Sequence, residues 1–147
     1  MLALLLALTL HVAGSPTRTA TARCQFVIVA RVVEGGRQRV CLTEIDGFPA
    51  PNVTMRSRGT MTFALRTGTI RMRVRITQRF RSDGRHAMQT TRGTIVGGTG
   101  RYRHARGTVT GAGTVVDTAT RLTNVHLAYR LVVGRASMSS RGLVASP

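Results

Sequence analysis

The chain has 147 residues, 42% of them apolar, so it is large and apolar enough for one domain with its own hydrophobic core. Arginine supplies all 22 basic residues against only five acids, and the formal net charge is +17. A chain without lysine cannot carry a P-loop, and a surface this basic is expected to attract anions.

The chain opens on an apolar run, MLALLLALTLHVAG, that is too short to span a bilayer comfortably. Ala20-Thr21-Ala22 follows and matches the small-x-small pattern of a cleavage site. We therefore predict a secretory signal peptide over residues 1–22 and a secreted, extracellular protein. Neither lysine nor arginine precedes the apolar run, which leaves a misplaced start or a residual anchor as alternatives.

Two cysteines, Cys24 and Cys41, follow the expected cleavage site, and an exported protein can bridge them. A hairpin around Gly35-Gly36 would put Cys41 opposite Ala30, roughly 20 Å along the strand from Cys24 at about 3.3 Å per residue. A disulfide needs Cα atoms within about 7 Å. The residues thus leave two outcomes open: free thiols, or a bridge that requires another register or a fold-back of the segment around Cys24.

The clearest strand pattern is TIRMRVRITQRFRSDGRHAMQTTRGTIV, residues 69–96, in which apolar and polar side chains alternate. Its first strand has an apolar face with Met72, Val74, Ile76 and Phe80. The opposite face is basic and carries Arg71, Arg73, Arg75 and Arg79. A two-residue turn at Asp83-Gly84 would set Met72 opposite Ile95 and Arg75 opposite Arg92.

Similar alternation runs from residue 23 to about residue 134, with turn residues at short intervals and no persistent helical period. It gives roughly seven or eight strands, a number typical of an antiparallel barrel or sandwich. We expect a single all-β domain over residues 23–134. Residues 135–147 have no periodic core face and are expected to form a flexible tail.

The glycine-rich stretch GTIVGGTGRYRHARGTVTGAG, residues 93–113, lacks the glycine spacing and the following helix of a dinucleotide site. It resembles the motif region of the allene oxide cyclase and dirigent barrel superfamily, in which G-G-T-G, an aromatic residue and A-R-G join two strands. The resemblance implies an eight-stranded antiparallel β-barrel with a central apolar cavity, often assembled as a homotrimer. It also implies that neither a metal nor an organic cofactor takes part.

What the resemblance implies about function is a small hydrophobic molecule held in the lumen. One branch of the superfamily cyclises a fatty-acid epoxide and the other guides the coupling of phenolic radicals, so a cofactor-independent isomerase and a non-catalytic dirigent-like protein both stay open. Arg106, in the A-R-G element, is the first candidate to contact a ligand, or else it bonds loop carbonyls. Tyr102 and an inward-facing Gln78 are further candidates, together with the apolar face of Met72, Val74, Ile76 and Phe80.

Catalytic and metal-binding patterns are sparse. No pair of acids can be placed in the lumen, and Asp117 is expected only to end a strand, so acid–base catalysis has no identified agent. His86, His104 and His126 lack metal-ligand spacing.

A second function, of another class, is a cationic barrel that binds an anionic surface such as cell-wall polymer, nucleic acid or acidic lipid. The arginines expected to form that basic face are Arg71, Arg73, Arg75, Arg79 and Arg92. Specific nucleic-acid recognition is not expected, because the chain has few aromatic residues and no RNA-recognition pattern.

Overall fold

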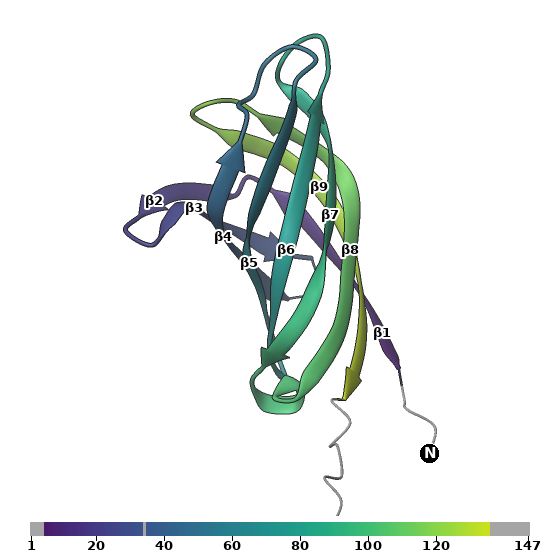
Figure 1. Ribbon diagram of the computed structural model, residues 1–147. Coiled ribbons are helices and arrows are strands. Elements are labelled where there is room, and N and C mark those ends of the chain that lie inside the picture. Colours follow the sequence, from purple (N-terminus) through teal and green to yellow (C-terminus); the bar gives the residue numbers. More distant parts are fainter. Residues whose placement is uncertain (1–4, 34, 136–147) are drawn as a thin grey trace, which may run out of the picture.

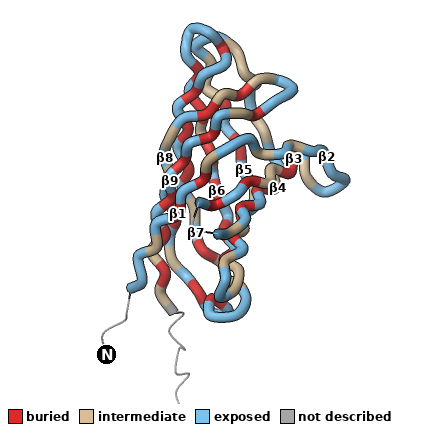
Figure 2. Tube along the Cα trace, turned by 180° about the vertical axis from the view of Figure 1, so that it is seen from behind, coloured by how far each residue is buried: buried red, intermediate tan, exposed pale blue. Residues whose placement is uncertain are grey.

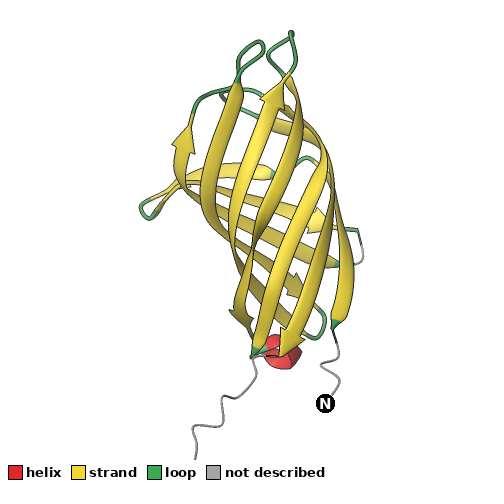
Figure 3. Cartoon of the chain, turned by 45° about the vertical axis from the view of Figure 1, so that its right-hand side comes forward, coloured by secondary structure: helices red, strands yellow, loops and turns green. Residues whose placement is uncertain are grey.

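Strands make up most of the computed structural model, which describes residues 5–33 and 35–135 (Figure 1). They are β1 (Leu6–Gly14), β2 (Thr17–Thr21), β3 (Cys24–Val32), β4 (Gly36–Asp46), β5 (Thr54–Leu65), β6 (Gly68–Phe80), β7 (His86–Gly98), β8 (Ala105–Asp117) and β9 (Leu122–Arg135). A single turn of 3-10 helix, η1 (Gly100–Tyr102), joins β7 to β8 at one end of the molecule (Figure 3). No helix in the described ranges is long and apolar enough to span a membrane.

The strands close into an eight-stranded antiparallel barrel, as predicted. From β3 to β9 each strand pairs with the next in the chain, and β1 pairs with β9 on one edge and meets β3 on the other, at Val12 and Val32. Strand β2 lies outside this ring and pairs with β3 alone, so that the β2–β3 hairpin projects from the side of the barrel (Figure 1).

The barrel includes a segment that the sequence assigned to a signal peptide. Residues 6–14 form β1 and residues 17–21 form β2, within the predicted leader of residues 1–22. Residues 6–14 form a strand because the larger apolar residues of LALTLHVAG occupy alternate positions. This alternation places the side chains of Leu10 and Val12 in the core. Cleavage after Ala22 stays a prediction, and such a cut would fall between these two strands and the rest of the barrel.

The expected register of β6 and β7 is confirmed. Met72 lies opposite Ile95 and Arg75 opposite Arg92, with the turn at Asp83-Gly84 between the two strands. The Asp83 carboxylate accepts hydrogen bonds from the N–H groups of Arg85 and His86, 2.9 and 3.0 Å away, and contacts the His86 ring. These bonds lower the pKa of Asp83 to about 2.

Cys24 and Cys41 form a disulfide, with Cα atoms 5.6 Å apart. The register that made this bridge difficult was wrong: Cys41 lies opposite Val27, and Ala30 lies opposite Gln38. The shift arises because β3 ends at Val32, which pairs with Gly36, so that the turn begins earlier than the pair Gly35-Gly36 suggested.

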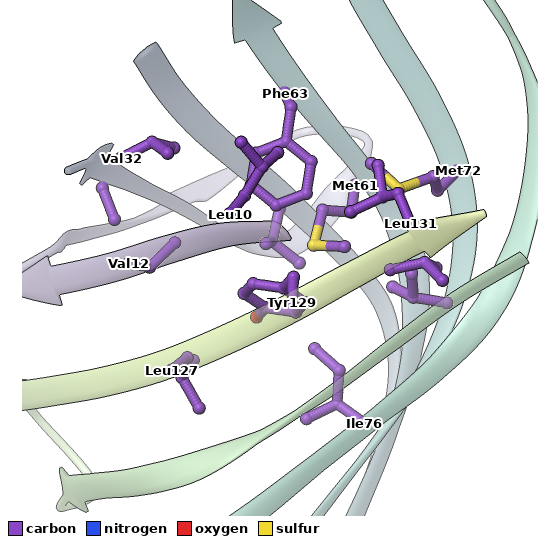
Figure 4. Close-up of a cluster of buried hydrophobic side chains, with 14 of the residues drawn as sticks. Leu10, Val12, Val32, Met61, Phe63, Met72, Ile76, Leu127, Tyr129 and Leu131 are labelled. Atoms are coloured by element: carbon purple, nitrogen blue, oxygen red, sulfur yellow. The ribbon is translucent and has the colours of Figure 1, made fainter. Parts of the chain in front are cut away.

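Buried and exposed positions alternate along the strands (Figure 2). One end of the barrel is filled by apolar side chains that include Met61, Phe63, Met72 and Leu131 (Figure 4). Tyr129 packs edge-on against Phe63, with ring centroids 5.4 Å apart. The Tyr129 ring fits because the residue facing it, Gly111, has no side chain. A Cβ atom on Gly111 would lie only 2.5 Å from the Tyr129 ring.

Strand β9 ends at Arg135, close to the expected end of the domain. The rest of the predicted tail, residues 136–147, lies outside the described residues.

Replacing Leu10 by alanine is expected to lower the free energy of unfolding by about 2–5 kcal/mol, because Leu10 is only 2% exposed and its loss leaves a gap in the ring. Thr9→Ala, on the outer side of β1, is the matched control and should cost less than about 0.5 kcal/mol. Urea denaturation of the full chain measures both. An equal change in the free energy of unfolding for the two variants would mean that β1 contributes nothing to the core.

Candidate functional site

A cavity with mixed lining lies in the lumen, in the half of the barrel away from η1, which we call the Asp117 end. Its apolar lining includes Ile28, Val40, Leu42, Met55, Ile76 and Leu127. Polar groups are contributed by Arg18, Gln38, Ser57, Gln78, Gln89 and Tyr129. The cavity volume is about 40 Å³, which is enough for a few water molecules.

Strand geometry explains why so many polar side chains meet there. Gln38, Ser57, Gln78 and Gln89 occupy inward positions on the consecutive strands β4 to β7, and all four are buried. Gln78 and Gln89 lie directly opposite each other, and the Gln78 amide donates a hydrogen bond to Gln89 Oε1 at 3.2 Å. This pair is a direct cross-strand contact, whereas Ser57 lies opposite Ile76 and Gln38 opposite Phe63.

Asp117 closes this polar cluster and is completely buried. Its Oδ2 accepts hydrogen bonds from Arg18 Nη2 and Gln78 Nε2, each at 3.0 Å. The Arg18 guanidinium also lies over the Phe26 ring, 5.1 Å from its centroid. Burial raises the pKa of Asp117, although the nearby Arg18 charge and the two hydrogen bonds oppose that effect. The carboxyl group is therefore more ready to hold a proton than a solvent-exposed aspartate.

Several buried polar atoms in the cluster have no hydrogen-bond partner among the described residues. They are Arg18 Nε, Gln78 Oε1, Thr91 Oγ1 and Asp117 Oδ1. A buried polar group without a partner costs about 1–3 kcal/mol, so natural cores rarely keep four together. Of the four, Arg18 Nε and Gln78 Oε1 belong to side chains that line the cavity, so these two are available to a polar group of a guest molecule.

Tyr129 marks the floor of the cavity. Gln38 Nε2 donates hydrogen bonds to Tyr129 Oη at 3.0 Å and to Met61 Sδ at 3.1 Å. Burial raises the pKa of the Tyr129 phenol, so that it stays neutral and keeps its proton. The Tyr129 hydroxyl is therefore a neutral hydrogen-bonding group among largely apolar lining residues.

The sequence-predicted ligand residues divide between the two ends of the barrel. Gln78 and Ile76 line the cavity, whereas Met72, Val74 and Phe80 are buried on the same face of β6 without lining it. Arg106 and Tyr102 lie at the other end, in the corner between β7 and β8.

At that corner the arginine of the A-R-G element bonds backbone carbonyls of β7 and β8 and none of the loop between them. Arg106 Nη1 donates to the carbonyl oxygens of Val96 and Ala105, at 2.6 and 2.9 Å. Tyr102 is buried and its hydroxyl accepts a hydrogen bond from Thr67 Oγ1 at 3.5 Å. The glycine-rich motif therefore acts as a barrel corner, and neither side chain reaches the cavity.

Sequence reasoning missed Arg18 and Asp117 as site residues: Asp117 ends its strand, as expected, but its side chain is also buried and bonded to Arg18 and Gln78. A signal for it exists, because Val109, Val115 and Asp117 occupy inward positions of one alternating strand. Arg18 was missed because it lies within the predicted leader.

The five arginines of the expected basic face lie on the exterior. Arg71, Arg73, Arg75, Arg79 and Arg92 are all exposed, on the outer side of β6 and β7. They are separate from the cavity, because successive side chains of a strand point to opposite faces. In the described part of the chain, no group of three or more His, Cys, Asp or Glu residues could hold a metal ion.

Comparisons with known proteins add no assignment to this site. No family model, curated protein or solved structure matches the chain. The case for a function therefore rests on the geometry of the lumen.

Asp117 should make stability fall as pH rises. Because its folded pKa is raised, the unfolded chain loses this proton first, above about pH 3.9, and the free energy of unfolding declines until pH passes the folded pKa. Asp117→Asn removes the decline, so urea denaturation should show the variant gaining on the wild type between about pH 4 and 7.

Asp83 provides the control, with the opposite sign. Its folded pKa of about 2 means that its contribution to stability is present above the unfolded pKa and is lost as pH falls toward 2. Asp83→Asn should therefore show no gain on the wild type as pH rises, and the stability that Asp83 contributes should instead shrink as pH falls below about 5. A difference between Asp117→Asn and the wild type that stays constant as pH rises would contradict the assignment of a raised pKa.

Proposed function

We propose that the protein binds a small molecule with an apolar body and a polar group at the Asp117 end of its lumen. The observation that carries this proposal is the cluster of Arg18, Gln78 and Asp117: Arg18 and Gln78 line the cavity, each with an unpartnered polar atom, and the buried Asp117 carboxylate accepts a hydrogen bond from both. Small-molecule sites are commonly apolar with a few convergent polar groups, and a perturbed carboxyl pKa is frequent at such sites.

The chemistry of the unpartnered atoms indicates the kind of polar group. Arg18 Nε can donate a hydrogen bond, and Gln78 Oε1 can accept one. A hydroxyl or phenol satisfies both, because it donates and accepts at once. A bound carboxylate would meet the Arg18 donor but would also face Asp117 Oδ1, which favours a neutral guest.

The size of the cavity favours a small guest. The cavity volume of about 40 Å³ is far smaller than the volume that a drug-sized ligand needs. The other half of the barrel is filled by side chains. A single ring or a short branched chain is the scale we propose. An extended fatty acid would require large movements of the packed residues around Met61 and Phe63.

Asp117 supplies a chemical group for a reaction. A carboxyl with a raised pKa, held by Arg18 and Gln78, can give a proton to a guest and take it back. Together with the resemblance to allene oxide cyclase and dirigent barrels, this supports guided cyclisation or coupling without a cofactor as the extension of the proposal. Secretion and a trimeric assembly stay predictions from the sequence.

Filling the cavity tests the proposal. Ser57 is buried, lines the cavity and has no hydrogen-bonding role in the cluster, so Ser57→Leu should occupy the guest's space. We expect at least a 10-fold loss of affinity for any ligand found by titrating the full chain with phenols, cyclic alcohols and short-chain acids. Intrinsic tyrosine fluorescence and NMR shifts of the Tyr129 ring report binding.

Thr60→Leu is the matched control, because it adds the same side chain to the exposed outer face of β5. It should leave affinity within about 2-fold of the wild type, since surface changes rarely reach a buried site. Urea denaturation checks that both variants fold. Binding that survives Ser57→Leu, or is lost equally in Thr60→Leu, would place the ligand outside the lumen.

A further inference from the structure

The outer side of β5, β6 and β7 carries a dense group of arginines, which we call the arginine face: Arg58, Arg71, Arg73, Arg75 and Arg92. The sheet register brings them together. Arg75 lies between Arg58 on β5 and Arg92 on β7, as a direct cross-strand neighbour of each. Arg71 and Arg73 continue the group along β6, at about 6.8 Å per two residues.

Few acids compensate this charge. In the described part of the chain, only Arg58 of the five has an ion pair, with Glu44 at 3.5 Å, and both side chains of that pair are largely exposed. Like charges directly opposite each other destabilise a sheet. The row of Arg58, Arg75 and Arg92 therefore opposes folding slightly, and a bound polyanion would relieve the repulsion.

We propose that the arginine face binds duplex nucleic acid through its phosphates, without reading the bases. A guanidinium group binds phosphate with paired hydrogen bonds, and the threonines that alternate with these arginines, such as Thr60 and Thr94, add hydroxyls that contact phosphate oxygens. Duplex DNA carries about one charge per 1.7 Å of its axis, so neutralising its phosphates releases many counterions.

The composition of the face distinguishes this partner from other anions. Membrane binding draws on apolar side chains that enter the lipid. Of the exposed large apolar residues that the structure describes, only Met88 lies on the outer side of β6 and β7, opposite Arg79, while Leu5, Leu6, Val33 and Phe48 lie on other segments. Single-stranded nucleic acid is usually held by aromatic stacking, and four of the six aromatic residues, Phe63, Phe80, Tyr102 and Tyr129, are buried.

Base recognition is not expected from this surface. Reading bases requires an element that enters a groove, such as a helix or a two-stranded ribbon. The arginine face is instead the broad outer wall of a closed barrel. It can lie along a phosphate backbone but cannot insert, so affinity should be independent of base sequence and strongly dependent on salt.

The test is fluorescence anisotropy of a labelled 20-base-pair DNA duplex with the full chain, over about 50–200 mM NaCl. The informative variant is the triple change Arg73→Gln, Arg75→Gln and Arg92→Gln. Each lost phosphate contact should reduce the slope of log affinity against log salt by about 0.9, so we expect a reduction of about 2–3 and at least a 10-fold loss of affinity at 100 mM.

The matched control removes the same charge from three exposed turn positions, with Arg23→Gln, Arg66→Gln and Arg101→Gln. It should stay within about 3-fold of the wild type. Equal losses in the two triple variants would mean that net charge alone attracts the duplex, and would overturn a defined site. Urea denaturation confirms folding, and the arginine-face variant should be at least as stable as the wild type because repulsion is removed.

Two further arms test the choice of partner. Single-stranded DNA of the same length, or vesicles of anionic and zwitterionic lipid, should bind less tightly than the duplex at 100 mM salt; tighter binding of either one would overturn the proposal. Duplexes of different sequence should bind within about 3-fold of each other. Ser57→Leu should not affect duplex binding, so this inference and the lumen proposal fail separately.

Discussion

The interior of this barrel depends on how its first strand closes the ring. Strand β1 pairs with β9 from Leu6 to Gly14, but it shares only one residue pair with β3, Val12 with Val32. A hydrogen bond from the Val33 N–H to the His11 carbonyl oxygen, at 2.9 Å, completes this narrow seam. The chain then passes Pro16 and brings Arg18 onto the buried carboxylate. One segment therefore supplies both the closure of the ring and the cation of the lumen.

The two halves of the lumen are stabilised by different interactions. Around Met61 and Phe63 the strands are held together by close apolar packing, in which each methylene removed from water stabilises the folded state. At the Asp117 end a charged pair is buried, and the cost of taking ions out of water makes such pairs a weak source of stability. The polar cluster therefore adds little to the stability of the fold, and its relevance lies in the ligand site proposed above.

Local patterns in the sequence predicted the fold better than the site. The alternation around Met72 and Arg73 fixed the β6–β7 register, because any slip would have mixed apolar and charged faces. The leucines of β1 satisfy the pattern of a leader and that of a strand equally, so the sequence did not predict that residues 6–14 contribute a strand to the barrel. Asp117 and its partner Arg18 lie 99 positions apart, and no short-range pattern links them.

The exposed turn between β2 and β3 contains Ala22 and Arg23. The disulfide from Cys24 to Cys41 anchors the chain directly after that turn, while the backbone pairs with β9 and β3 hold the strands before it. A break in the peptide bond at the turn would therefore leave two polypeptides in one ring, with the shorter one seated as an ordinary strand. The first strand is held by its hydrogen bonds to β9 and by buried leucine and valine, in addition to its covalent connection to the rest.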